Sequence, residues 1–403
     1  MNVLLSAYAC VPNAGSEPGN GWNWATHLAE RGMQVTVLTR ADNQPQIESY
    51  LTWNAQANLT FAYVNVPSSI ARPTTGLHYA LWHWRAVDVA TKLHRAAKFD
   101  VIHHITYTSI HVPTQLWRLG VPTIFGPVGG GQTTPPAMLT YFGSSARKEK
   151  LRTLVTRALL LSPLHRRWLK KMSVVFAANS DTLMLIQKLG RSDVRLQFDN
   201  GIASDYLLDE PREFTPREGP TRLLWVGRML PRKALPMALD ALARTRRDAT
   251  LTIVGNGLDA EVVQNMIAER GLSDRVNWAG RRLTMEEVRA AYIEHDALLF
   301  TSVRETSGVQ LLEAMALGLP IICLDLHGAH DVVPDAAGFK IAVTTPLEVI
   351  EGLAKAIDRF YEMNCGEKDA MALASWRFAR NNTWPMRAEA AERVYEEVLA
   401  KHP

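Results

Sequence analysis

The stretch TSVRETSGVQLLEAMALGLPII, residues 301–322, combines a Ser-Gly turn with the start of an apolar helix. Ser307 and Gln310 have the spacing of a capping box, which predicts Ser307 as the N-cap of a helix. Gly318, about ten residues later, is a typical helix terminator. We therefore expect a helix over residues 308–317.

Two glutamates flank this helix start, Glu305 in the preceding loop and Glu313 roughly 9 Å further along the helix axis. That separation does not suit a retaining glycosidase pair, whose carboxylates lie about 5 Å apart. The backbone N–H groups and the helix dipole favour a phosphate instead, and carboxylates on either side of it suit sugar hydroxyls. An ordinary capped helix with one solvated glutamate remains the alternative. The predicted phosphate-binding residues are Thr306, Ser307, Gly308 and Val309.

Short apolar runs alternate with longer helical patterns along the whole chain, which predicts an α/β protein with parallel sheets covered on both faces. Residues 199–222 are rich in proline and charge and separate two series of strands. The first series is expected at 2–9, 34–39, 59–64, 101–105, 122–125 and 174–177. The second is expected at 221–227, 249–255, 275–280, 297–302 and 320–324. After about residue 345 the pattern is helical, with Pro385 in the first turn of a last helix.

Composition is that of a soluble globular protein, with 403 residues, a net charge of +4 and 47% hydrophobic residues. No apolar run reaches the roughly 18 residues that a membrane-spanning helix needs. The N-terminus lacks a basic signal-peptide region, so we expect a cytoplasmic protein that starts at Met1. The three cysteines, Cys10, Cys323 and Cys365, have neither disulfide nor zinc-site spacing, and no metal site is expected.

A second charged motif, LLWVGRMLPRKAL, follows a buried strand in the second half of the chain. Gly227 and Arg228 come directly after the strand and Lys233 five residues later, at the edge where α/β sheets bind ligands. Two cations there would neutralise a diphosphate leaving group as its bond to a sugar breaks. Solvated loop charges are the simpler alternative.

These motifs together resemble glycosyltransferase family four, a retaining family with the GT-B fold. The order VGRMLPRKAL, IVGNGLDAE, RVNWAG and RETSGVQLLEAMALGLPII matches the family over about 110 residues, including its E-x7-E signature. The resemblance implies two Rossmann-like parallel-sheet domains that face a central cleft. It places an acceptor-binding domain at 1–200, a nucleotide-sugar-binding domain at 201–380 and a crossing helix at 381–403.

The same resemblance implies a role for each matching position. Arg228 and Lys233 hold the donor diphosphate, Glu305 contacts the donor sugar, and Glu313 binds the ribose hydroxyls. Gly15 matches a glycine loop that closes over the phosphates. The implied reaction is transfer of a sugar from a UDP- or GDP-linked donor with retained configuration, without a metal ion or other cofactor.

The first half of the chain departs from the family pattern. Many relatives have a histidine after the strand expected at 122–125, where this chain reads GPVGGGQ. We expect backbone N–H groups of Gly129, Gly130 and Gly131 to serve in its place, although a plain glycine turn is equally consistent. His104, at the end of a strand, is a further candidate for a contact with the sugar or acceptor.

Residues 147–171 carry nine Lys and Arg against one Glu, a net charge of +8, mixed with leucines. This pattern predicts peripheral contact with an anionic membrane surface and hence a lipid-linked acceptor. The alternative is a helix that packs its apolar stripe on a sheet. No nucleic-acid-binding motif accompanies the charge.

Two enzyme classes compete with a glycosyltransferase. Gly255, Gly257 and Ala260 satisfy the G-x-G-x-x-A dinucleotide fingerprint, with Asp274 near the expected ribose position, which indicates an NAD-dependent oxidoreductase. A nucleotide-sugar epimerase or a phosphorylase on the same fold is the other alternative. A catalytically inactive scaffold protein is a third alternative. The intact set of charged residues argues against it.

Overall fold

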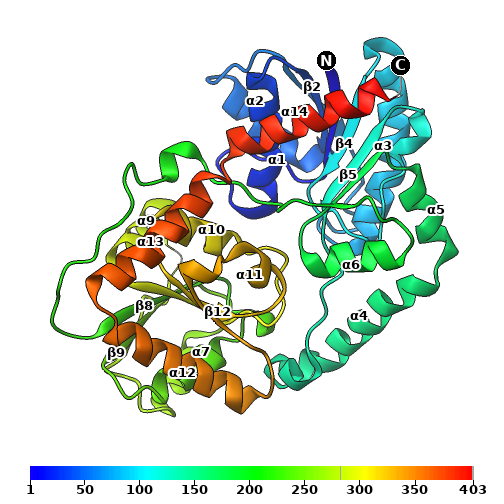
Figure 1. Ribbon diagram of the computed structural model, residues 1–403. Helices are drawn as coiled ribbons and strands as arrows, with labels where there is room; N and C mark the ends of the chain where they lie inside the picture. The colour runs from blue at the N-terminus through cyan, green and yellow to red at the C-terminus, as the bar shows by residue number, and fades with distance from the viewer. Residues whose placement is uncertain (282, 402–403) are drawn as a thin grey trace. The chain divides into compact units, whose positions relative to one another are not determined.

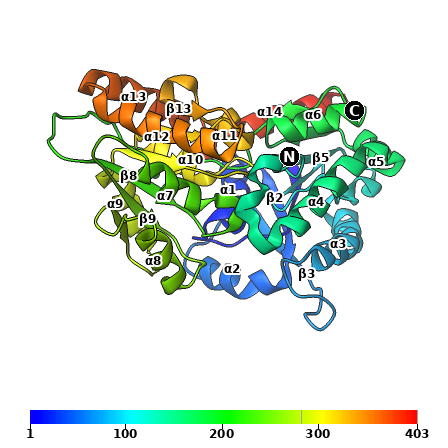
Figure 2. The same cartoon turned by 90° about the horizontal axis from the view of Figure 1, so that it is seen from below.

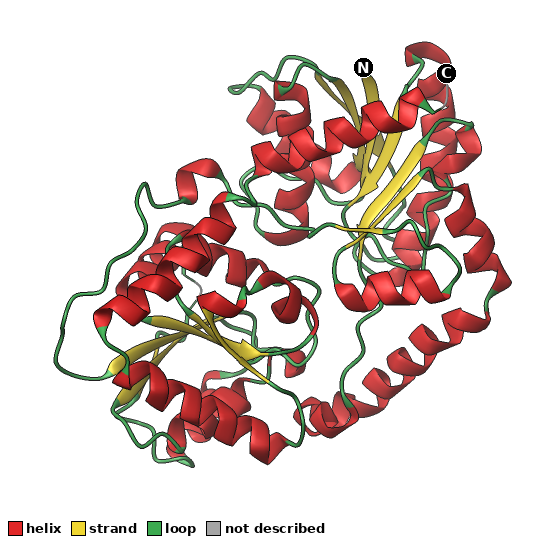
Figure 3. Ribbon diagram, in the orientation of Figure 1, coloured by secondary structure: helices red, strands yellow, loops and turns green. Residues whose placement is uncertain are grey.

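The computed structural model of the chain describes residues 1–281 and 283–401. These residues form two compact units, each built on one parallel sheet with helices on both faces (Figure 1; Figure 3). The predicted α/β architecture with two Rossmann-like sheets is therefore confirmed. Each unit is described below by itself.

Unit 1 contains residues Met1–Gly131 and Thr156–Gly201 and the chain from Thr383 through the last helix. Its sheet has the order β3-β2-β1-β4-β5-β6-β7, all parallel. The strands are β1 (Asn2–Ala7), β2 (Gln34–Arg40), β3 (Leu59–Val64), β4 (Val101–Ile105), β5 (Thr123–Val128), β6 (Val174–Ala177) and β7 (Arg195–Leu196).

The helices of unit 1 bury both faces of this sheet, because successive strand residues point to opposite sides. Val3 packs with Trp24 and Tyr395 on one face, while its neighbour Leu4 packs with Trp82 on the other. The helices are α1 (Ser16–Glu30), α2 (Gln44–Leu51), α3 (Gly76–Ala97), α5 (Pro163–Lys171), α6 (Ser180–Lys188) and α14 (Trp384–Ala400).

Unit 2 contains residues Gln132–Val155 and Ile202–Asn382, and its parallel sheet has the order β10-β9-β8-β11-β12-β13. Its strands are β8 (Thr221–Val226), β9 (Ala249–Val254), β10 (Val276–Trp278), β11 (Ala297–Phe300), β12 (Ile321–Leu324) and β13 (Gly338–Ile341). Its helices are α7 (Leu235–Ala243), α8 (Ala260–Ala268), α9 (Met285–Glu294), α10 (Val309–Ala316), α11 (His327–Val332), α12 (Pro346–Glu362) and α13 (Cys365–Arg380). On one face of the sheet α7 and α12 lie side by side (Figure 2).

Residues 132–155, here called the arm, pack on unit 2 although they lie between two strands of unit 1 in the sequence. Met138 and Phe142 of the arm are buried in the hydrophobic core of unit 2. Helix α4 (Ala146–Ala158) begins in the arm and ends in unit 1. The arm thus brings the first part of the basic segment, from residue 147, to unit 2.

Candidate functional site

The order of the strands in unit 2 locates its binding edge. Strand β8 lies between β9 and β11, so the connections from β8 and β11 diverge to opposite sides of the sheet at this point. Ligands of open α/β sheets bind at such a switch point, beyond the carboxyl ends of the strands. Arg228 follows β8 and Glu305 follows β11, so both predicted residues lie at this edge.

The centre of this edge is an ion pair between Lys233 and Glu305, whose Nζ and Oε2 atoms are in direct contact. Lys233 is only 5% exposed, and its backbone carbonyl accepts a hydrogen bond of 2.9 Å from the Thr301 hydroxyl. Burial alone would raise the pKa of Glu305, but Lys233 and Arg232 outweigh it and hold that pKa below its usual value. Burial lowers the pKa of Lys233, and Glu305 opposes that effect. The structure thus joins two of the predicted catalytic residues.

Glu313 lies on α10 near the same lysine, in a different environment. The Tyr292 hydroxyl donates to its Oε2 at 3.0 Å, and Lys233 Nζ is 3.5 Å from Oε1 of Gln310 on the same helix. Burial raises the pKa of Glu313, and the Tyr292 hydrogen bond and Lys233 only partly oppose it. The two glutamates of the signature therefore differ in proton affinity: Glu305 is held ionised, whereas Glu313 is the weaker acid.

The predicted capping box at Ser307 is wrong. The N-cap of α10 is Gly308, which has a left-handed backbone (φ +75°) and no side chain with which to cap the helix. A Cβ at Gly308 would lie 3.1 Å from the Phe300 ring and 3.4 Å from the Glu305 side chain. Glycine is therefore required by both the backbone angle and the close approach of the loop. Gly318 follows the end of the helix, as predicted.

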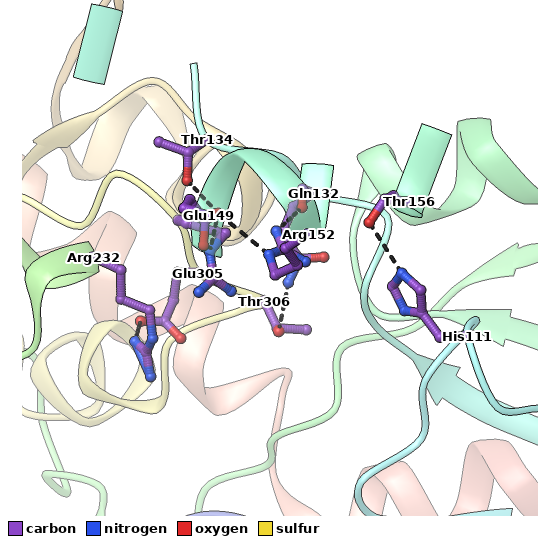
Figure 4. A network of polar contacts seen from close by, with 10 residues as sticks. His111, Gln132, Thr134, Glu149, Arg152, Thr156, Arg232, Glu305 and Thr306 are labelled. Carbon is purple, nitrogen blue, oxygen red and sulfur yellow. Dashed lines mark hydrogen bonds and ion pairs between the residues drawn. The ribbon is translucent and has the colours of Figure 1, made fainter. Parts of the chain in front are cut away.

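The arm supplies a group of polar residues that the sequence analysis missed. Gln132 donates to the Thr306 hydroxyl at 3.0 Å. Glu149, 5% exposed, accepts a hydrogen bond of 2.7 Å from Thr134, and its Oε1 lies 2.9 Å from Arg304 Nε. Figure 4 shows the neighbouring side chains of this group, namely Gln132, Thr134, Glu149, Arg152, Arg232, Glu305 and Thr306. Glu149 is the one acidic residue of the basic segment 147–171, and this isolated charge is the feature of the sequence that could have indicated its role.

Unit 1 has the same kind of switch point, between β1 and β4. Glu17, in the first turn of α1, accepts a hydrogen bond of 2.8 Å from the backbone N–H of Tyr107, in the loop after β4. Burial and the nearby Asp199 raise the pKa of Glu17 to about 7, although the Tyr107 hydrogen bond opposes the shift. The predicted loop residue Gly15 is the N-cap of α1. A Cβ on it would meet no other atom within 4 Å, so packing does not require glycine there.

The assignment of His104 to a ligand-facing position is wrong. His103 and His104 are both fully buried, because β4 is a central strand with helices on both faces. His104 lies within hydrogen-bond distance of Ser6 (2.9 Å) and Tyr79 (3.1 Å), and burial holds its pKa well below the usual value. His104 is a neutral core residue.

The glycine turn after β5 was predicted to offer its backbone N–H groups to a ligand, and two of them are used otherwise. The N–H of Gly129 donates to the carbonyl of Thr108 and that of Gly131 to the hydroxyl of Thr182, both at 3.1 Å. These two donors stabilise the turn and are not directed at a ligand. His111, a residue that the sequence analysis missed, has its ring next to the predicted Gly130, where a Cβ would lie 3.1 Å from Nδ1.

The dinucleotide fingerprint has a structural explanation that involves no cofactor. Gly255 follows β9, which is not at the switch point of the sheet. A Cβ on Gly255 would lie 1.9 Å from the carbonyl oxygen of Gly227, so glycine allows the loops after β8 and β9 to touch. Gly257 has a positive φ of 125°. The spacing therefore reflects loop packing.

The described residues also bear on metal binding and on membrane insertion. No group of three or more His, Cys, Asp and Glu side chains among them is placed to share a metal ion. Among the same residues, no helix has both the length and the apolar character required to cross a bilayer.

Comparison with known proteins agrees with these observations. The family model described as "Glycosyl transferases group 1" matches residues 209–374, and the "Glycosyl transferase 4-like domain" matches residues 22–201. The chain is 27% identical over 348 residues to 2-deoxystreptamine glucosyltransferase of Streptomyces kanamyceticus, covering 82% of this chain and 86% of that protein. It is 26% identical over 401 residues to phosphatidyl-myo-inositol mannosyltransferase of Mycobacterium leprae, covering 94% of each.

The fold is shared with solved structures. Sucrose-phosphate synthase from Thermosynechococcus elongatus superposes with a TM-score of 0.68 at 16% identity, over 99% of both chains. At that identity the likeness concerns the fold alone, and it agrees with the two Rossmann-like sheets.

Proposed function

The chain belongs to glycosyltransferase family four and has the GT-B fold, and on that premise we propose that it transfers a sugar from a UDP- or GDP-linked donor to a lipid-linked glycan. Both curated relatives described above are named as glycosyltransferases, and the mycobacterial one is named for a phosphatidylinositol acceptor. The product would be a surface polysaccharide or a glycolipid.

The observation that carries this proposal is the buried Lys233–Glu305 pair at the switch point of unit 2. An ammonium group that is 5% exposed needs a fixed anionic partner, and here Glu305 supplies it. A donor diphosphate beside Lys233 and the exposed Arg228 would place its negative charge next to two cations whose positions the fold already sets. The largest benefit comes in the transition state, when the diphosphate gains charge as it leaves.

The remaining predicted residues complete the proposed donor site. The backbone N–H groups at the start of α10, at Gly308 and Val309, and the positive end of the helix dipole would bind the phosphates. Glu313 accepts hydrogen bonds from the ribose hydroxyls, and Glu305 contacts the donor sugar. Since side chains and the helix provide the positive charge, the proposed transfer needs no metal ion. We further propose that the sugar keeps its anomeric configuration, as in the family.

The proposed membrane contact rests on the polarity of α4. This helix buries Glu149 toward the protein and exposes Leu151 (60%), Leu154 (64%) and Val155 (48%). A helix that only packed its apolar stripe on a sheet would show the opposite pattern. Exposed leucines among nine basic residues fit the interface of an anionic membrane, to which the protein would bind peripherally on the cytoplasmic side.

A thermal-shift screen of UDP, GDP, ADP, CMP and NAD without added metal tests the donor site. A nucleotide at 100 times its Kd stabilises the folded protein by about 2.7 kcal/mol through mass action. We expect one nucleoside diphosphate to raise the melting temperature of the native protein and to lose most of that effect in Glu313→Ala. Glu261→Ala, an exposed glutamate on α8, is the matched control and should respond like the native protein. A response to NAD and to no nucleoside diphosphate would overturn the proposal.

A further inference from the structure

A pocket of about 290 Å³ lies between the arm and the loop that leads to Lys233. Four of its lining residues are cations, Lys148 and Arg152 from α4, Arg232 from the turn after β8, and Arg304 from the loop after β11. Glu149 is the acidic residue in this lining, so the ionisable groups of the pocket carry a net charge of +3. Phe142 contributes an apolar wall.

The cations in this pocket are held close together by the fold. Arg152 and Arg304 share the Glu149 carboxylate, with Nε atoms 3.3 and 2.9 Å from Oε1. Burial and the nearby Arg152 and Arg232 lower the pKa of Arg304 to about 10, although Glu149 opposes the shift. Glu149, together with the Glu305 contact of Arg232, does not balance these four cations, and an additional anion in the pocket would offset the remaining repulsion.

The pocket adjoins the proposed donor site but is separate from it. Lys233, Glu305 and Glu313 are not among the residues that line it. Arg232 connects the two sites, because it lines the pocket while its Nη1 lies 3.4 Å from Oε2 of Glu305. A group bound in the pocket would therefore lie close to the donor sugar without competing for the diphosphate position.

We propose that this pocket binds a phosphate group carried by the acceptor. Clustered guanidinium groups match the geometry of phosphate oxygens through paired hydrogen bonds. The exposed Leu151 and Leu154 lie on another face of the helix that supplies Lys148, so a lipid chain on that helix and its phosphate in the pocket would be near neighbours. The inference rests on the proposed function, because it specifies the acceptor of the same reaction.

The test measures binding of inorganic phosphate to the full chain at constant ionic strength, with the nucleoside diphosphate kept saturating. We expect phosphate to add a further thermal shift, and Lys148→Glu to weaken phosphate affinity at least about tenfold, since a charge-assisted contact is replaced by repulsion. Lys150→Glu is the matched control, because Lys150 is exposed on the same helix but does not line the pocket, and it should retain phosphate binding. No added shift, or an equal loss in both variants, would overturn the pocket assignment.

This design separates the two hypotheses. If no nucleoside diphosphate binds, the proposed function fails; if one binds and phosphate adds nothing, only the pocket assignment fails. Vesicle sedimentation then distinguishes an acceptor phosphate from phospholipid headgroups as the source. Equal weakening of anionic-vesicle binding by Lys148→Glu and Lys150→Glu supports the acceptor, whereas a much larger loss in Lys148→Glu assigns the pocket to headgroups and contradicts the proposal.

Discussion

At the scale of single residues, the Lys233–Glu305 pair combines a structural role with the proposed catalytic one. Removing one partner of a buried ion pair leaves an uncompensated charge, which costs roughly 3–5 kcal/mol. Removing both partners leaves no such charge. The losses of stability caused by the two single substitutions should therefore not add up in the double variant, as is usual for groups in direct contact.

A double-mutant cycle measures this coupling. We expect Lys233→Met and Glu305→Leu each to lower the free energy of unfolding by about 3 kcal/mol, and the double variant to lose clearly less than the sum. Urea unfolding provides the measurement. Strict additivity of the two losses would show that the pair is not coupled in solution.

Glu17 gives a pH dependence at the same scale. Its pKa of about 7 in the folded protein lies above the usual 4.5, so between those values the folded state holds the proton more tightly than the unfolded state. The contribution of this group to stability is therefore present at low pH and is lost as pH rises toward 7, by roughly 3 kcal/mol. Glu17→Gln retains an acceptor for the Tyr107 N–H and should remove this part of the slope. An identical stability–pH profile for variant and native protein would contradict the assignment.

At the scale of elements, the start of α10 depends on one glycine. Gly308→Ala places a Cβ in a left-handed backbone, at a cost of about 1–2 kcal/mol, and within 3.1 Å of the Phe300 ring. We expect lower stability and weaker binding of the nucleoside diphosphate, measured by calorimetric titration. Gly120→Ala is a useful control, since that glycine also has a positive φ (+74°) but a Cβ there meets nothing within 4 Å. It should lose stability and retain nucleotide affinity.

The elements also show how far sequence reasoning reaches. Strands β3, β4 and β6 have the predicted bounds because they are short apolar runs between turn residues. Strand β7 has two residues, and β13 reads Gly-Phe-Lys-Ile with no fully buried position, so neither carries a pattern to detect. The prediction of Ser307 as the N-cap was wrong because Gly308 adopts the left-handed backbone angle that this tight loop needs.

The candidate site was predicted in part for similar reasons. Motif spacing in the sequence indicates that Lys233 and Glu305 each follow a strand. The sheet order places those two strands next to each other at the switch point, and the two side chains are in contact there. His104 was misassigned because a histidine on a central strand looks the same in sequence whether it is buried or exposed. The contacts of Glu149 depend on how the arm packs on unit 2, and no local pattern encodes that packing.

At the scale of the whole molecule, the proposed function includes a membrane contact made by α4. The double variant Leu151→Gln and Leu154→Gln removes apolar groups that are 60% and 64% exposed, so it should not lower the melting temperature. It should weaken sedimentation with anionic vesicles, because each leucine contributes apolar area to the interface. The same changes at Leu4 and Leu5, which are fully buried, would instead unfold unit 1. Unchanged vesicle binding by the exposed variant would refute the contact.

The proposed sugar transfer is measured as release of nucleoside diphosphate from UDP- and GDP-sugars incubated with the protein and a membrane-lipid extract. We expect turnover with one of the two bases and labelled sugar in the lipid phase. Lys233→Met should lower the rate by about a hundredfold or more, because the positive charge that neutralises the departing diphosphate is lost. A near-normal rate in Lys233→Met would contradict the central role of the Lys233–Glu305 edge.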